Sequence, residues 1–124
     1  MAEFGYASSR RLDTCHPSLQ VLFRAVVHEF DCSVLEGHRS NERQLDLLNA
    51  DPPRTTLGPG KSTHNVTPSR GIDVVPYPVD WDDTGRFQHF AGYVKGVAAM
   101  LGIKIIWGGD WKSFKDFPHF EIVE

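Results

Sequence analysis

The sequence predicts an α+β fold: a small, mostly antiparallel sheet with about three helices packed on it. Two observations support this fold class. In two long segments, apolar residues recur at three- and four-residue steps, as on the buried face of a helix. Short apolar runs of strand length, bounded by glycine and proline, lie between and after these segments. A chain of 124 residues has the size of one ordinary domain, so we expect a single domain over residues 1–124.

The first predicted helix spans Pro17–Phe30, and proline suits its first turn because the missing N–H costs nothing there. Its apolar face consists of Leu19, Leu22, Phe23, Val26, Val27 and Phe30. Cys32–Leu35 is predicted to form a short strand, and Gly37–Ser40 a turn. Ser40 is suited to cap a short second helix, whose apolar residues are Leu45, Leu47 and Leu48.

The chain changes character over residues 51–70, where six prolines and glycines interrupt a segment with little apolar content. This composition predicts a long loop, and long loops inside compact domains are often functional. The remaining predicted elements are a strand at Gly71–Val75, a helix with Asp83 or Thr84 as its N-cap and Gly102 at its end, and strands at Ile103–Trp107 and His119–Val123. The sequence does not determine the order in which these strands pair.

Charge and composition exclude several classes of protein. Lys+Arg 13 against Asp+Glu 16 gives a net charge of -3, which leaves no broad basic field for nucleic acid or an anionic membrane. The longest mostly apolar stretch, Gly96–Ile103, is far too short to span a bilayer, and the first residues lack the apolar region of a secretory signal. Cys15 and Cys32 are too few for a disulfide scaffold. We expect two reduced thiols, with a single disulfide left open.

Six histidines in 124 residues suggest a metal site, and two of them stand out. His64 lies late in the polar loop, and His119 lies where the last predicted strand begins. Between them, Asp73 lies inside an apolar strand, where a carboxylate is costly unless it is paired or coordinated. Two histidines and one aspartate form a zinc ligand set that leaves a fourth position for water and lowers the pKa of that water to about 7. Scattered polar residues are the alternative.

A hydrolytic zinc site also needs a general base, and Asp116 is the nearest candidate, three residues before His119. Residues three apart on a regular strand point to opposite faces. A bend must therefore separate the two, and Pro118 suits a strand start or a bulge. Glu121 shares the strand face of His119, so it either orients that ligand or is simply exposed. His16 is expected to lie at the surface or to cap the first helix.

These residues and their neighbours resemble the VanY-type zinc peptidases, and within that family the phage endolysin branch. The matching motifs occur in order along nearly the whole chain: Leu12-x-Thr14-x-His16-Pro17-x-Leu19-Gln20, Glu36-Gly37-x-Arg39-Ser40-x-x-x-Gln44, Ser62-x-His64 followed by Asn65-Val66-Thr67-Pro68-Ser69-Arg70-Gly71-Ile72-Asp73-Val74, Trp107-Gly108-Gly109-Asp110-Trp111, and Asp116-x-x-His119-Phe120-Glu121. The resemblance implies a hedgehog/D-Ala-D-Ala-peptidase-like fold. One departure is Gly71, where the family pattern has alanine; we expect it to loosen the strand entry without touching a ligand.

The resemblance implies a role for each matched position. Three positions match the ligands of one zinc ion: His64, Asp73 and His119. Asp116 matches the catalytic general base, and Arg39 matches a residue that contacts the substrate or the developing oxyanion. Ser62 and Gln44 match positions near the substrate. Trp111 is expected, apart from the resemblance, to line the groove beside the zinc. For the tryptophans, Trp81 and Trp107 included, packing in the core or at its rim is the alternative.

The implied activity is that of a zinc endopeptidase that cuts the L-Ala–D-Glu bond of the peptidoglycan stem peptide and lyses the bacterial host. A D,D-carboxypeptidase that removes terminal D-Ala, a non-catalytic peptidoglycan-binding module and a small structural phage protein are the alternatives. The branch often carries a separate cell-wall-binding domain as well, for which 124 residues leave no room, so we expect a single catalytic domain and a Gram-negative host. We expect a monomer that accumulates in the host cytoplasm and reaches the wall through a holin-type partner.

Overall fold

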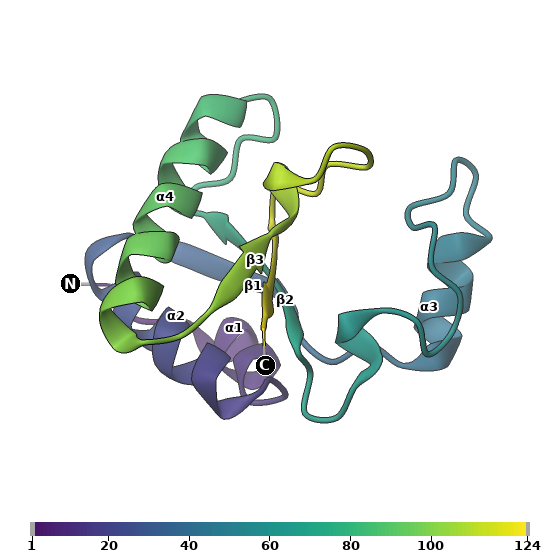
Figure 1. The fold of residues 1–124 in the computed structure, drawn as a ribbon, viewed down its shortest axis with the longest axis horizontal. Coiled ribbons are helices and arrows are strands. Elements are labelled where there is room, and N and C mark those ends of the chain that lie inside the picture. The colour runs from purple at the N-terminus through teal and green to yellow at the C-terminus, as the bar shows by residue number, and fades with distance from the viewer. Residues whose placement is uncertain (1, 124) are drawn as a thin grey trace.

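The structure is a computed structural model that describes residues 2–123. Its elements, in chain order, are α1 (Tyr6–Leu12), α2 (Pro17–Glu29), β1 (Cys32–Glu36), α3 (Asn41–Leu48), the 3-10 helix η1 (Thr63–Asn65), β2 (Gly71–Pro76), α4 (Thr84–Leu101), β3 (Ile105–Trp107), the 3-10 helix η2 (Gly108–Asp110) and β4 (His119–Ile122). Figure 1 shows α2 and α4 on one side of the sheet, and α3 with the loop that follows it on the other. The predicted α+β class is confirmed.

The four strands form one antiparallel sheet in the order β1-β2-β4-β3. Pairing places Asp73 of β2 opposite His119 of β4, and Ile72 opposite Phe120. Ile72 and Phe120 are fully buried in the core. Because side chains alternate between the two faces of a strand, Asp73 and His119 lie together on the opposite face. The pleat of two short strands therefore brings two of the predicted metal ligands together.

The apolar core lies between the sheet and helices α2 and α4, which also contact each other. Phe120 packs edge-to-face against Phe23 of α2 and Phe90 of α4, with ring-centroid distances of 5.5 and 6.1 Å. Burying a side chain of this size stabilises the fold by about 1.5–3 kcal/mol. One phenylalanine of β4 thus joins both helices to the strand that carries His119.

The ends of the helices follow the predicted signals. The N-caps Ser40 and Asp83 are confirmed, because each side chain accepts a hydrogen bond at 3.0 Å from the backbone N–H three residues on. His16 caps α2. Gly102 ends α4 in the left-handed conformation, with φ 71°, which glycine adopts without strain. None of the helices in residues 2–123 is both long and apolar enough to cross a membrane.

Three details of the predicted elements are wrong. Residues 2–123 contain four α-helices rather than about three, because α1 buries only Leu12 and so shows no helical apolar period. Short 3-10 helices occupy part of the predicted loop and the turn at Gly108–Asp110. The third strand begins at Ile105 rather than Ile103, because the backbone N–H of Ile103 bonds back to the Ala98 carbonyl at the end of α4.

Cys15 and Cys32 are both buried and form no disulfide. Burial raises the pKa of Cys15 to about 11 and that of Cys32 to about 12. Both thiols are therefore protonated at neutral pH and behave as small apolar side chains. Of the two possibilities that the sequence left open, the reduced pair is the one observed.

Candidate metal centre

Three side chains from separate elements converge on one point: His64 of η1, Asp73 of β2 and His119 of β4. His64 Nε2 lies 3.1 Å from His119 Nδ1, and both nitrogens lie 3.2 Å from Asp73 Oδ1. The two histidines are buried and Asp73 is half-buried. Within residues 2–123, no other group of three histidine, cysteine or acidic side chains is placed to hold a metal ion. The structure thus brings the three predicted ligands together.

The outer atoms of the two histidines determine which nitrogen faces the cluster. His64 Nδ1 donates to the carbonyl of Gly37 at 2.7 Å, and His119 Nε2 donates to Glu121 Oε1 at 2.8 Å. A neutral imidazole carries a hydrogen on only one nitrogen, so the nitrogens facing Asp73 present lone pairs. When both imidazoles are neutral, two lone pairs and a carboxylate oxygen thus meet in a buried site, an arrangement that a bound cation stabilises. Of the two possibilities for Glu121, the structure shows the one in which it orients a ligand.

The triangle of donor atoms has the size that a zinc ion requires. Zinc binds nitrogen and oxygen at about 2.0–2.2 Å in tetrahedral geometry, which places neighbouring ligand atoms about 3.3 Å apart. The observed separations are 3.1 and 3.2 Å. Two imidazoles and one carboxylate are donors that zinc accepts, and three protein ligands leave a fourth position for water or substrate. The residues present therefore fit a catalytic zinc ion.

The electrostatics of the cluster also favour a bound cation. Burial alone would raise the pKa of Asp73, but hydrogen bonds from His119 and His64 outweigh burial and hold this pKa well below its usual range. Burial alone would lower the pKa of His119, but its hydrogen bonds to Asp73 and Glu121 raise it to about 9. In the metal-free protein, a proton on His119 therefore supplies part of the positive charge that a metal ion would bring.

Asp116, the predicted base, lies in a turn directly before β4. Its carbonyl accepts a hydrogen bond from His119 N–H at 3.2 Å, and its own N–H donates to the Gly108 carbonyl at 3.1 Å. This turn supplies the bend that the spacing between Asp116 and His119 requires. Burial raises the pKa of Asp116, and the nearby Asp73 carboxylate raises it further, while neighbouring cationic groups offset part of the rise. The site therefore holds a carboxyl group whose pKa is shifted toward neutral pH.

Arg39 is held beside the ligands by two carboxylates and one amide. Its Nε and Nη2 donate to Glu36 Oε1 at 2.9 and 2.5 Å, and its Nη1 donates to Gln44 Oε1 at 2.9 Å. Nη2 also lies 3.7 Å from Asp73 Oδ2. The Arg39 side chain is only 10% exposed, so its guanidinium is a fixed positive charge next to a metal ligand. Such a charge is suited to stabilise a developing oxyanion.

Gln44 and Ser62, both predicted to lie near the substrate, are buried and contact other residues of the site. Gln44 is fully buried, and its amide nitrogen donates to the Leu57 carbonyl at 2.9 Å and to Thr55 Oγ1 at 3.3 Å. The Ser62 hydroxyl caps η1 by accepting from the backbone N–H of His64 at 3.2 Å. Both side chains therefore position other residues of the site. A direct contact between either one and the substrate stays a prediction.

Two glycines come so close to the site that a side chain would not fit. The carbonyl of Gly37 accepts from a ligand histidine, and a Cβ at this position would collide with the Thr14 hydroxyl. A Cβ at Gly71 would collide with the Thr63 hydroxyl and would lie 3.0 Å from His119 Cε1. A side chain at position 71 would therefore contact a predicted ligand, whereas Gly71 itself has no side chain to do so. The spacing of residues in the sequence did not indicate these close approaches, because each of the two glycines meets residues that lie far from it in the chain.

Two hollows of about 440 and 430 Å³ flank the ligands. The first is lined by Trp111, whose ring centroid lies 5.2 Å from that of His119. The second is lined by the exposed ring of Trp81 and by two of the metal ligands. Asp116 lines both hollows. Trp111 thus lies where a groove-lining residue is expected, and Asp116, the predicted base, borders both hollows.

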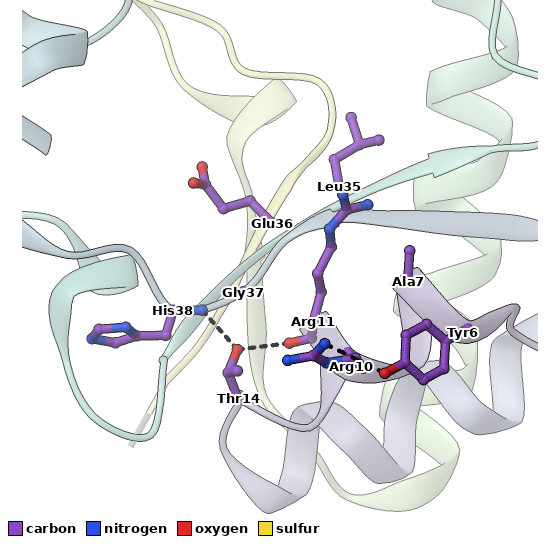
Figure 2. Close-up of a pocket in the computed structure, with 9 residues that line it drawn as sticks. All are labelled: Tyr6, Ala7, Arg10, Arg11, Thr14, Leu35, Glu36, Gly37 and His38. Carbon is purple, nitrogen blue, oxygen red and sulfur yellow. Dashed lines mark hydrogen bonds between the residues drawn. The ribbon is translucent and has the colours of Figure 1, made fainter. Parts of the chain in front are cut away.

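A further hollow, of about 550 Å³, lies between α1 and the end of β1 (Figure 2). Figure 2 shows Thr14 within it, where its hydroxyl donates to the Arg11 carbonyl at 2.6 Å and accepts from His38 N–H at 2.8 Å. Leu35 and Glu36 line both this hollow and the second one beside the metal ligands. None of the three metal ligands lines it. The candidate metal ligands therefore border the other two hollows and not this one.

Comparison with known proteins agrees with this geometry. The model of the family described as phage L-alanyl-D-glutamate peptidase matches residues 1–123. An L-alanyl-D-glutamate peptidase of Escherichia phage T5 is 30% identical over 125 residues, which covers 97% of this chain and 88% of that protein. The peptidoglycan L-alanyl-D-glutamate endopeptidase CwlK of Bacillus subtilis (strain 168) is 31% identical over 108 residues, 75% of this chain and 61% of that protein.

The fold has a solved counterpart as well. The crystal structure of the Serratia marcescens L-Ala D-Glu endopeptidase ChiX matches with a TM-score of 0.79 and 32% sequence identity. The match covers 97% of this chain and 90% of that chain. The resemblance to the endolysin branch that the motifs indicated is confirmed. The chain belongs to the phage L-alanyl-D-glutamate peptidase family.

Proposed function

We propose that this protein is an endolysin-type zinc endopeptidase that hydrolyses the L-Ala–D-Glu bond of peptidoglycan stem peptides. The relatives in phage T5, B. subtilis and S. marcescens are all named for peptidase action on that pair of residues, which favours an endopeptidase over a D,D-carboxypeptidase. The observation that carries the proposal is the triangle of two imidazole nitrogens and one carboxylate oxygen beside Asp116. This combination of a metal site and a base also argues against a module that only binds.

The zinc ion would be held by His64, Asp73 and His119, and when bound it would polarise the scissile carbonyl and lower the pKa of a water molecule to about 7. The orientation of each histidine is fixed by a hydrogen bond from its other ring nitrogen, which goes to the Gly37 carbonyl from His64 and to Glu121 from His119. Ligands that are oriented in advance bind a metal more tightly and in one geometry.

Asp116 takes the proton from the attacking water and then delivers it to the leaving amine of D-Glu. Its raised pKa suits a group that must accept and donate a proton in one catalytic cycle. The hydrogen bond from its backbone N–H to Gly108 fixes the turn that carries it. The base is therefore positioned before the substrate binds.

Arg39 provides positive charge for the oxyanion that develops on the scissile carbonyl. Glu36 and Gln44 hold its guanidinium, so little reorganisation is needed when that charge appears. Trp111 forms a wall of the groove beside His119. Each of these residues was assigned by its motif, and the contacts around Arg39 and Trp111 support the assignments.

Digestion of purified Gram-negative peptidoglycan, followed by mass spectrometry of the products, tests the proposed function. We expect the zinc-loaded protein to release stem peptides cut after L-Ala, and a chelator-treated sample to release none. Loss of D-Ala alone would instead establish a D,D-carboxypeptidase. A zinc-loaded protein that yields no product would show that the site binds a metal without this activity.

Two features of the biological setting are supported by the family resemblance alone. One is accumulation in the host cytoplasm, and the other is release by a holin-type partner. Expression in a Gram-negative host tests both: the chain alone should leave the cells intact, and co-expression with a holin should lyse them. Lysis by the chain alone would contradict the need for a partner.

A further inference from the structure

We propose that Arg54 binds the free carboxylate of the D-Glu residue and so favours stem peptides in which this carboxylate is not amidated. This inference rests on the function proposed above. Arg54 lies in the loop after α3, and its side chain is exposed. Three residues line both hollows beside the metal ligands: Arg54, Thr55 and Asp116. Arg54 is the cation among them.

The chemistry of the substrate places a carboxylate near this position. The amine of D-Glu forms the scissile bond, one of its two carboxyl groups continues the peptide, and the other remains free. The leaving amine must lie beside Asp116 in order to receive a proton. Whichever hollow the D-Glu residue enters, both Asp116 and Arg54 line it. A carboxylate only a few bonds from the leaving amine would therefore enter a hollow that Arg54 also lines.

The charges around the site point to Arg54 rather than to its arginine neighbours. The guanidinium of Arg39 already binds Glu36 and lies beside Asp73. Arg43 Nε lies 4.0 Å from the same Glu36 carboxylate. Within residues 2–123, the Arg54 side chain has no ion-pair partner, and only its backbone N–H makes a hydrogen bond. Its planar guanidinium can bind a carboxylate through two parallel hydrogen bonds.

The loop holds the backbone of Arg54 while leaving its side chain free. The Arg54 N–H donates to the Leu47 carbonyl at 3.0 Å, at the end of α3. The residues that follow Arg54 are also held, because the Gln44 amide donates hydrogen bonds to Thr55 Oγ1 and to the Leu57 carbonyl. The starting point of the side chain is thus fixed relative to the site. Substitution of the exposed side chain should leave these backbone contacts intact.

Two stem peptides test the proposal: one with the free carboxylate on D-Glu, and one in which this carboxylate is amidated. The values of kcat/KM are measured for both peptides with the zinc-loaded protein and with Arg54→Gln. We expect the wild type to prefer the free acid by about tenfold, the effect of one partly exposed charged hydrogen bond. Arg54→Gln should lose this preference through slower cleavage of the free acid, with cleavage of the amide unchanged within about twofold.

Two control variants separate this role from general charge effects. Lys61→Gln removes a cation from the first hollow alone, and Arg24→Gln removes one that is paired with Asp13 at 2.9 Å, outside both hollows. Both variants should keep the preference, and thermal melting should show that all three variants fold. A preference that persists in Arg54→Gln, or disappears in Lys61→Gln instead, would overturn the proposal. A wild type that cleaves both peptides equally would also overturn it, whereas a wild type that cleaves neither would refute the proposed function itself.

Discussion

Residues 38–65, which we call the arm, bury little apolar surface, whereas the rest of the described chain, the body, is built around an apolar core. In the arm, α3 buries only Gln44 and Leu47. In the body, α2 and α4 each bury five apolar side chains. Hydrogen bonds take the place of a core in the arm, as where Asn65 Nδ2 donates to the Arg39 carbonyl at 2.9 Å.

The cluster of predicted metal ligands lies where these two regions meet. Asp73 and His119 come from the sheet of the body, and His64 comes from the arm. The body thus gives a rigid platform with two ligands, and the arm adds the third ligand and Arg39. We infer that substitutions in the body mainly lower the free energy of unfolding, whereas substitutions in the arm mainly lower catalytic activity.

The largest effect on stability is expected in the body. Phe120→Ala removes the ring that packs against both α2 and α4, and should lower the free energy of unfolding by about 3–5 kcal/mol. Urea denaturation measures this loss. Leu45→Ala is the control in the arm, because Leu45 is 43% exposed, and it should cost less than about 0.5 kcal/mol. Similar losses in the two variants would contradict the division into body and arm.

Zinc should join the two regions and stabilise both. At free zinc 100 to 1,000 times its Kd, the free energy of unfolding should rise by about 2.7–4.1 kcal/mol. Thermal melting with zinc and with a chelator measures the shift. His64→Ala removes the ligand of the arm and should abolish it. The same shift in His64→Ala would mean that the metal does not bridge body and arm.

Gln44 is the polar centre of the arm, so its loss should cost both stability and turnover. Gln44→Ala leaves Arg39 Nη1 and the Leu57 carbonyl without the Gln44 amide as partner, and should lower the free energy of unfolding by about 1–3 kcal/mol. The kcat on peptidoglycan should fall as well, because Arg39 loses its fixed position. The matched control is Gln88→Ala on the exposed side of α4. Normal kcat in folded Gln44→Ala would remove the positioning role.

A smaller effect is expected from pH in the metal-free protein. The pKa of His119 is raised from 6.5 to about 9 in the folded state, so its protonation stabilises the fold fully below pH 6.5. This contribution is lost as the pH rises through about 9. The thiols stay protonated in this range, because the lower of their raised pKa values is about 11. Chelated protein should therefore melt at a higher temperature at pH 6.5 than at pH 9.5, and equal melting temperatures would contradict this.

The same division explains how much could be predicted from the sequence. Apolar periodicity and capping residues predicted α2, α3 and α4, because burial of an apolar face and satisfaction of the first N–H groups act locally. α1 was missed because it buries a single residue, Leu12. Strand order was out of reach, since pairing between β2 and β4 depends on contacts between segments far apart in the chain.

For the site, the unusual acid in an apolar strand and the motif spacing predicted His64, Asp73 and His119 as ligands, and the structure brings the three together. The supporting contacts were harder to find. Gln44 was assigned to the substrate, although its amide faces Arg39 and the loop. The carbonyl of Gly37 offers no side-chain signal at all. Residues that contribute through a backbone group, or through contacts with distant parts of the arm, can be recognised only in the three-dimensional structure.

The most direct test of this account is the zinc content and turnover of Asp116→Ala. Because Asp116 lies beside the predicted ligands without belonging to the donor triangle, the variant should hold one zinc ion per chain, as we also expect of the wild type. It should nevertheless lose most cleavage of the stem peptide, by at least about 100-fold. Near-normal turnover in the zinc-loaded variant would contradict the role of Asp116 as base, and loss of the zinc would contradict the assignment of the ligands.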